Sequence, residues 1–153
     1  DNFMAGFELR AEAQWEDSIY DHHMRALEEQ VATQEAWVGW LGVLSPYVAM
    51  RSLSAGLCGT DYVHHRHFTT HAEGWRKAMV NQLNDAFADN AGTEGWAYTA
   101  GPDLWKKVPP FHYDYPSPRL ALETHWVSLF SLLLWLIGAI FLAVVSARRL
   151  EVV

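Results

Sequence analysis

Apolar residues along positions 3–35 recur mostly at spacings of three to five, which places them on one stripe of an α-helix. The stretch contains no proline and a single glycine, and it is rich in residues of high helix propensity. It predicts one long amphipathic helix, or two helices with a kink near Gly6 or Asp21. His22 and His23 fall in its polar part, where we expect solvated side chains. The residues of the stripe are Phe3, Phe7, Ala11, Trp15, Ile19, Met24, Leu27 and Val31.

The next stretch, residues 36–50, is largely apolar and carries no charge. Gly39, Gly42 and a Ser45-Pro46 pair interrupt it, so it is too short and too broken to cross a bilayer comfortably. Its tryptophans suit a segment that lies at a membrane interface or packs against other helices. A second membrane crossing here is the alternative.

Short local signals mark the next helix. Ser45 followed by Pro46 is typical of a helix N-cap with proline in the first helical position. A helix is therefore expected from Pro46 towards Cys58, with Gly59 as its stop.

A third helix follows and leads into an irregular connector. Thr60 or Asp61 is placed to cap this helix, which continues to about Phe87. The region Asn90 to Pro118 then holds five of the six prolines. It predicts an irregular loop in which "VPPFHYDYPSP" is extended rather than helical.

The end of the chain is the most apolar part. From Trp126 to Ala147, 22 consecutive residues carry no charge. At about 1.5 Å per residue such a helix spans roughly 33 Å, enough to cross a hydrocarbon core of about 30 Å. The alternative is the buried core helix of a soluble protein, but the rest of the chain is too short and too polar to cover it on every side. The pattern predicts an all-α chain that ends in one transmembrane helix.

Charges beside this segment favour one orientation. Arg148 and Arg149 follow it directly, and positive charges next to a span favour the cytoplasmic side. We therefore expect residues 1–122 to form an extracytoplasmic helical domain, 123–147 the membrane helix and 148–153 a short cytoplasmic tail.

Composition narrows the classes of partner. The residues ahead of Trp126 carry 17 acidic and 9 basic side chains. This balance argues against nucleic acid as a partner and against attachment to anionic lipid through charge. A single cysteine, Cys58, excludes an intrachain disulfide and a multi-cysteine zinc site. The chain begins at Asp1 rather than Met, and we expect it to be a piece of a longer protein.

Four of the eight histidines lie between positions 64 and 71. Three of them, at i, i+3 and i+7, share one helix face with Asp61, and a stripe of imidazoles with a carboxylate is a candidate Zn²⁺ site. The stripe is Asp61, His64, His67 and His71, while His65 points elsewhere. The favoured interpretation is a set of polar-face histidines that bind no metal, because the pattern is not HExxH. A pH sensor built on the same imidazoles is the third hypothesis.

The apolar residues of this predicted helix lie mainly on a face distinct from the histidines, and we expect that face to pack on the first helix. They are Tyr62, Phe68, Trp75, Met79 and Leu83. Glu73, Arg76 and Lys77 are spaced for solvent-exposed ion pairs within the helix. The chain contains no phosphate loop, no nucleophile elbow and no dinucleotide fingerprint, so we expect neither an enzyme nor a bound cofactor.

The order of "LSPYVAMRSLSAGLCGTDYVHHRHFTTHAEGWRKAMVNQLN", a proline-rich "PPFHYDYP" and a final apolar helix resembles the C-terminal part of bacterial ABC-2-type permeases that carry a DUF3526 domain. The resemblance covers nearly the whole chain, and "SP…GTD…H..F" is its most specific run. The resembling residues are Leu44, Ser45, Pro46, Leu53, Ala55, Gly56, Gly59, Thr60, Asp61, His65, Phe68, Ala72, Glu73, Trp75 and Arg76.

The resemblance implies a membrane-spanning permease subunit of an ATP-binding cassette transporter in the bacterial inner membrane, multi-pass in the full-length protein. Its expected partners are a cytoplasmic ATP-binding subunit, a second permease subunit and membrane lipid. No catalytic residues carry over. One alternative is a single-pass, membrane-anchored extracytoplasmic domain that binds metal or a protein. Another is a membrane-bound metallohydrolase that uses the histidine stripe.

Overall fold

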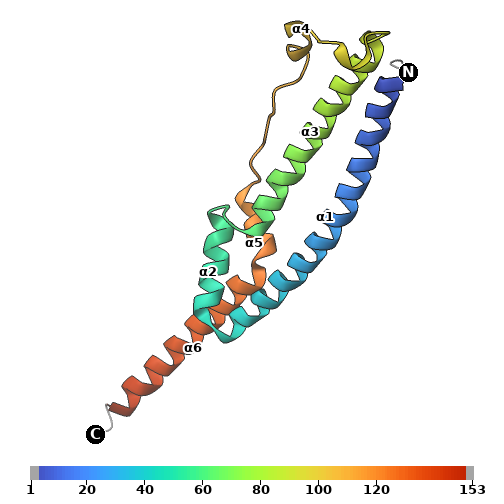
Figure 1. Ribbon diagram of the computed structural model, residues 1–153. Helices are drawn as coiled ribbons and strands as arrows, with labels where there is room; N and C mark the ends of the chain where they lie inside the picture. The colour runs from blue at the N-terminus through green and yellow to red at the C-terminus, as the bar shows by residue number, and fades with distance from the viewer. Residues whose placement is uncertain (1–3, 151–153) are drawn as a thin grey trace. The chain divides into compact units, whose positions relative to one another are not determined.

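The protein is built from α-helices, and the predicted all-α fold is confirmed (Figure 1). The computed structural model describes residues 4–150, and no strand occurs among them. The helices are α1 (Ala5–Leu44), α2 (Pro46–Leu57), α3 (Tyr62–Asn90), a 3₁₀ helix (Gly95–Ala97), α4 (Pro102–Trp105), α5 (Pro118–Thr124) and α6 (Trp126–Leu150). The predicted helix start at Phe3 and the last three residues of the predicted tail lie outside the described residues.

Helix α1 is longer than the sequence pattern predicts. It runs without a break past Gly39 and Gly42 as far as Leu44. A Cβ added at Gly42 would lie only 3.3 Å from the Cα atom of Ala49 in α2. Gly42 is therefore a point of close approach between two helices rather than a helix end.

The break between α1 and α2 is a single residue, Ser45, as the Ser-Pro signal predicts. Ser45 has an extended backbone and Pro46 opens α2. The Ser45 hydroxyl, however, makes no capping hydrogen bond, so proline's fixed φ and missing N–H are the features that favour a helix start here.

The proline-rich connector is extended, since residues 109–117 have no regular secondary structure. The indole N–H of Trp75 donates to the carbonyl of Pro109 at 2.8 Å. The rings of Phe68 and Trp75 both meet Phe111 edge-on, at 5.9 and 5.8 Å between centroids. The structure thus gives these two side chains a partner in the connector, which the sequence pattern did not predict.

The described residues form two compact units, and both α1 and α3 contribute to each. Unit 1 contains the residues up to Glu29 together with Phe68–Asp114, and unit 2 contains Gln30–His67 together with the residues from Tyr115 onward.

In unit 1, long charged side chains connect α1 to α3. The Nζ atom of Lys77 lies 2.6 Å from Asp21, and Arg10 donates to Asp85 at 2.7 Å. Arg76 reaches Asp17 across the helices and also binds Glu73 within α3. The spacing of Glu73, Arg76 and Lys77 had predicted pairs inside one helix, and the structure adds the contacts to α1.

In unit 2, small residues bring the helices close together. Helix α2 packs against α5 and α6. The most buried residues of this unit are Ala49, Ala121, Ser128 and Ser131, and Ser131 is fully inaccessible to solvent. The small side chains let the helix backbones approach one another closely.

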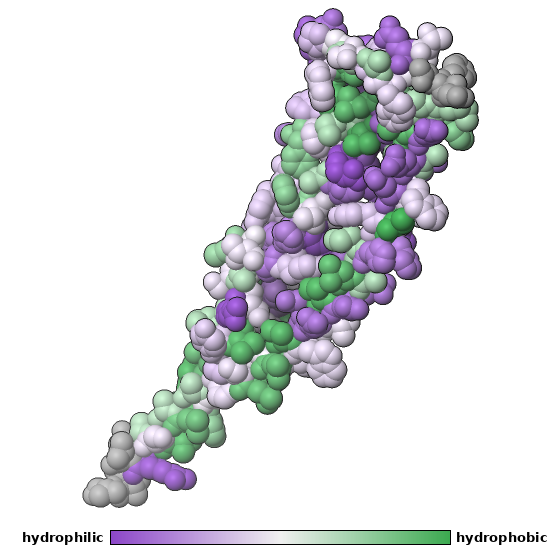
Figure 2. Space-filling view, viewed as in Figure 1, coloured by the Kyte–Doolittle hydropathy of each residue, from purple (hydrophilic) through white to green (hydrophobic). Residues whose placement is uncertain are grey.

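Helix α6 presents a largely apolar surface to its surroundings. Its segment Trp126–Arg149 is the one helix among residues 4–150 that is long and apolar enough to cross a membrane. Ile137, Phe141 and Leu142 each expose about 65% of their surface. Figure 2 shows green, hydrophobic residues along this helix and a purple patch near its end. A helix whose apolar side chains are left uncovered is suited to lipid rather than to water.

Candidate functional site

The candidate site lies in unit 2, at the junction of α2 and α3. Helix α2 ends in a left-handed turn at Gly59, whose φ is +66°. The Gly59 N–H donates to the carbonyl of Gly56 at 3.1 Å, and the Thr60 N–H donates to that of Ala55 at 2.9 Å. These two bonds form a Schellman motif, which satisfies carbonyls at the helix end. The predicted stop at Gly59 is confirmed.

Asp61 begins α3. Its Oδ1 atom accepts the backbone N–H of His64 at 3.0 Å, which is the bond of an N-cap residue. Of the two candidates for the cap, Asp61 rather than Thr60 makes this bond; the Thr60 hydroxyl donates back to Ala55.

Both oxygens of Asp61 also accept hydrogen bonds from imidazoles. Nδ1 of His64 lies 2.5 Å from Oδ1, and Nε2 of His125 lies 2.6 Å from Oδ2. An ionised carboxylate only accepts, so these two ring nitrogens carry the protons and donate. The carboxylate thus fixes which nitrogen is protonated in each ring, and it ties the start of α3 to the residue between α5 and α6.

The cluster is buried. Its side chains expose 6% of their surface at Asp61, 4% at His64 and 11% at His125. A buried carboxylate requires partners of this kind, because removal of a charge from water is unfavourable unless hydrogen bonds replace the lost hydration.

Two glycines make room for the cluster. A Cβ at Gly56 would collide with the ring of His125, and one at Gly59 would collide with the hydroxyl of Tyr115. The Tyr115 ring in turn stacks on His64, with 5.6 Å between the ring centroids. The "SAGLCGTD" run therefore places its glycines where two aromatic side chains from later in the chain approach the backbone.

Burial and hydrogen bonding act in opposite directions on the pKa of Asp61. Burial is the largest single influence and raises this pKa. The hydrogen bonds from His125 and then from the backbone and ring of His64 together outweigh it, so the pKa of Asp61 is lowered below its ordinary value. Asp61 is therefore a carboxylate at neutral pH.

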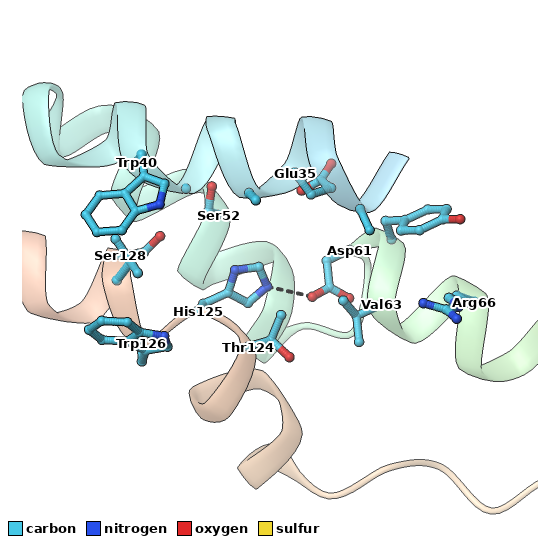
Figure 3. A pocket seen from close by; sticks show the side chains of 15 residues that line it. Glu35, Trp40, Ser52, Asp61, Val63, Arg66, Thr124, His125, Trp126 and Ser128 are labelled. Atoms are coloured by element: carbon cyan, nitrogen blue, oxygen red, sulfur yellow. Dashed lines mark hydrogen bonds and ion pairs between the residues drawn. The ribbon is translucent and has the colours of Figure 1, made fainter. Parts of the chain in front are cut away.

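A pocket of about 440 Å³ opens beside the cluster, and Asp61 and His125 form part of its wall (Figure 3). Trp40, Ser128 and Trp126 gather at one end of the pocket and Arg66 lies at the other. Two indoles, buried imidazole and carboxylate groups and a guanidinium thus share one cavity of a size typical for small-molecule sites.

The other histidines of the predicted stripe do not join Asp61 and His64. The ring of His71 meets Tyr113 edge-on, and His65, which lies off the stripe, is exposed. Within residues 4–150, no three His, Cys, Asp or Glu side chains are grouped so as to hold a metal ion. The zinc hypothesis for the stripe Asp61, His64, His67 and His71 is therefore not supported by the geometry.

The remaining residues of the predicted motif have structural positions. Ser45 and Pro46 form the turn between α1 and α2, and Phe68 contacts the connector. The guanidinium of Arg76 donates to both oxygens of Glu73, at 2.6 and 2.7 Å. These hydrogen bonds lower the pKa of Glu73, with burial acting against them.

Sequence reasoning missed His125 and Tyr115. Each lies more than 50 positions from its partner, and no local spacing links them. One signal was present: His125 is the last ionisable residue before the apolar helix. A polar side chain at the mouth of a predicted span is a candidate for pairing with the domain that precedes it.

Comparison with known proteins identifies the family. Residues 2–114 match the family described as "Domain of unknown function (DUF3526)". Curated proteins and solved structures gave no match. The match covers well over half of the chain and includes the α2–α3 junction with Asp61 and His64. This chain therefore belongs to the DUF3526 family.

Proposed function

We propose that this chain is part of the membrane-spanning permease subunit of an ABC-2-type transporter in the bacterial inner membrane. The observation that carries the proposal is the bond between Asp61 and His125, 2.6 Å long, at the residue that directly precedes α6. It fastens the family domain to a helix that is long and apolar enough to cross a membrane. A transport subunit requires such a joint, because movement of its membrane helices has to reach the domain outside the bilayer.

In this proposal the chain hydrolyses nothing itself. A separate ATP-binding subunit on the cytoplasmic side moves the membrane helices, and the helical domain follows as a lid or docking surface for the transported molecule. A second permease subunit completes the assembly. The pocket between Trp40, Arg66 and Trp126 is the natural place for a transported or guiding molecule to make contact, since it lies against the start of α6.

Co-purification tests the proposal. The tagged protein is solubilised from bacterial membranes in mild detergent, and its partners are identified by mass spectrometry. We expect an ATP-binding cassette protein in stoichiometric amount, absent from a control purification of an unrelated single-span protein with the same tag. Recovery of the chain alone, from membranes that contain the transporter's other subunits, would contradict the proposal and favour the single-pass anchored domain.

The orientation has its own test. Cys58 is the single cysteine and its surface is exposed. In spheroplasts, a membrane-impermeant maleimide should label Cys58, and a Cys58→Ser variant gives the background. Labelling that appears only after the membrane is broken would place the domain in the cytoplasm instead.

A further inference from the structure

A large apolar surface surrounds the turn between α1 and α2. From Ala36 to Met50 the chain carries no charge. Its large side chains are left open to the surroundings, with Leu44 exposing 76% and Tyr47 66% of their surface. Trp37, Trp40, Leu41 and Met50 are exposed as well. A contiguous apolar surface of this kind has an apolar partner.

Two hydrogen bonds fix the depth of this turn along α6. The Ser131 hydroxyl donates to the carbonyl of Gly42 at 2.6 Å, and the Trp135 indole N–H donates to the carbonyl of Val43 at 3.1 Å. Ser131 and Trp135 lie five and nine residues past Trp126. At 1.5 Å per residue the turn sits roughly 7 to 14 Å along α6 from its first tryptophan.

Helix α2 then returns along α6 in the opposite direction. Gly56, near its end, lies against the ring of His125, which directly precedes α6. Ten residues separate Pro46 from Gly56, and ten separate His125 from Trp135. The end of α1 and the start of α2, residues 36–50, therefore form a helical hairpin beside the first turns of α6, and the tip of the hairpin lies deepest.

Protein groups satisfy three of the last carbonyls of α1 at the tip. The carbonyl of Leu41 accepts the N–H of Ser45 at 3.2 Å. The next two carbonyls, of Gly42 and Val43, accept the side chains of α6, and Pro46 has no N–H to satisfy. The last carbonyls of a helix have no partner within the helix, and in water they are hydrated. In hydrocarbon they need internal donors, and α6 supplies two of these, one to Gly42 and one to Val43.

We propose that this hairpin, residues 36–50, is re-entrant: it dips into the half of the bilayer next to Trp126 and leaves on the same side, with lipid acyl chains as its partner. The proposal rests on α6 crossing the membrane, and it adds a second membrane-embedded element to the family domain. The main support is that the exposed apolar surface of the hairpin is continuous with that of α6. It lies at the depth of the first turns of α6.

The charges around the hairpin fit this depth. Glu35 and Arg51 are the first charged residues on either side of it. Arg51 lies midway along α2 and its surface is exposed. A long arginine side chain at that level extends to the headgroups while its methylenes stay in the apolar layer. Trp37 and Trp126 are both exposed and both suit the interfacial layer.

Spin labels test the depth directly. In a Cys58→Ser background, single cysteines replace Leu44 at the tip, Phe141 in α6 and Trp15 in the part of α1 that belongs to unit 1. The labelled protein is reconstituted into phosphatidylcholine–phosphatidylglycerol vesicles. Collision with oxygen, which concentrates in the bilayer, is compared with collision with a water-soluble nickel chelate. Trp15 is the matched control, because it is also exposed and apolar on the same helix.

We expect the label at position 44 to behave like that at 141, with frequent oxygen collisions and a loss of nickel collisions, while position 15 shows the reverse. A label at Tyr47→Cys repeats the tip measurement, and circular dichroism confirms that each variant keeps its helix content. Nickel access at 44 and 47 equal to that at 15 would overturn the hairpin. Low access to both reagents would overturn it as well, because a protein then covers the surface.

The two proposals fail separately. Nickel access at position 141 would show that α6 lies in water, and the hairpin would fall with it. Absence of an ATP-binding subunit from the purified protein would overturn the transporter proposal and leave the depth measurement standing.

Discussion

The two units of this protein hold their helices by opposite means. In unit 1, α1 and α3 are connected by charged side chains that keep contact with water; the side chains expose 43% and 60% of their surface in the Arg10–Asp85 pair and 21% and 25% in the Lys77–Asp17 pair. In unit 2, glycine, alanine and serine bring backbones into contact, and the central carboxylate exposes 6%. Both arrangements contain Asp side chains with cationic or imidazole partners, so burial is what separates them.

The difference shows where stability is concentrated. An exposed ion pair contributes little, because water and salt compete with it and two long side chains lose freedom. A buried carboxylate with three hydrogen-bond donors contributes much more. If the carboxylate or one of its donors is removed, the remaining buried groups have neither a protein partner nor water to bind. We therefore expect unit 2 to be sensitive to single substitutions and unit 1 to tolerate them.

The largest effect is expected at Asp61. Asp61→Ala removes the cap of α3 and leaves two buried imidazoles without their acceptor, so the free energy of unfolding should fall by about 3 kcal/mol. Chemical denaturation in detergent, followed by tryptophan fluorescence, measures it. The matched control is Asp114→Ala, which removes an exposed Asp–His pair at 3.3 Å. Equal effects of the two substitutions would remove the contrast between the units.

The pH dependence of the same site separates charge from capping. The pKa of Asp61 is lowered in the folded protein, so its carboxylate stabilises the fold above the ordinary value of 3.8 and loses this contribution as the pH falls through the lowered value. Asp61→Asn keeps a cap but has no charge. The stability difference between wild type and Asp61→Asn should therefore shrink in acid, and a constant difference would assign the effect to capping alone.

The next effect in size concerns Gly59. Alanine there takes a left-handed backbone, which is unfavourable by about 1–2 kcal/mol, and its Cβ also meets Tyr115. Gly92→Ala is the control, because Gly92 has φ +49° and open space around it. Thermal unfolding should show a larger loss at 59 than at 92. In a Tyr115→Ala background the loss at 59 should come down to that at 92.

A smaller effect is expected within α6. Ser131→Ala removes the donor to the Gly42 carbonyl and should lower stability by about 1 kcal/mol. Ser146→Ala, at an exposed position of the same helix, should leave it unchanged. Unfolding in lipid nanodiscs measures both. If Ser131→Ala left stability unchanged, the Gly42 carbonyl would have to accept another donor. The hydrogen bond between α1 and α6 would then contribute nothing to stability.

The smallest effect is expected in unit 1. Arg76→Gln removes contacts to Glu73 and Asp17 but should cost only about 0.5 kcal/mol, because the Arg76 side chain is 43% exposed. The loss should become smaller still in 1 M salt, because salt screens the Arg76 contacts in the wild type and the variant lacks them. A loss of stability as large as that of Asp61→Ala, measured by the same denaturation, would show that the two units are equally sensitive to single substitutions.

Short-range sequence signals predicted the helix ends that depend on interactions between neighbouring residues. The Ser45-Pro46 turn, the stop at Gly59 and a cap at Thr60 or Asp61 each depend on a few neighbouring residues. All three occur in the structure, with Asp61 as the cap. The charge-free run after Trp126 likewise predicted the one described helix that is suited to a membrane.

Predictions failed where the deciding partner is distant in the sequence. Gly39 and Gly42 were interpreted as interruptions of the apolar stretch 36–50, because nothing in the sequence shows that Ala49 lies against the second of them. Phe68 and Trp75 contact a connector that passes 34 or more positions later. The histidine that completes the site, His125, lies 64 positions after its carboxylate.

The position of Tyr115 has a practical consequence for where this domain is cut. The family match ends at residue 114, and the next residue is the one whose ring covers His64 and whose hydroxyl meets Gly59. A chain truncated at the family boundary would keep Asp61 and His64 but lose both Tyr115 and His125, so its carboxylate would be uncovered on one side. An isolated domain should therefore be expressed with its C-terminal boundary beyond His125. We expect this longer segment to be more stable than one that ends at the family boundary.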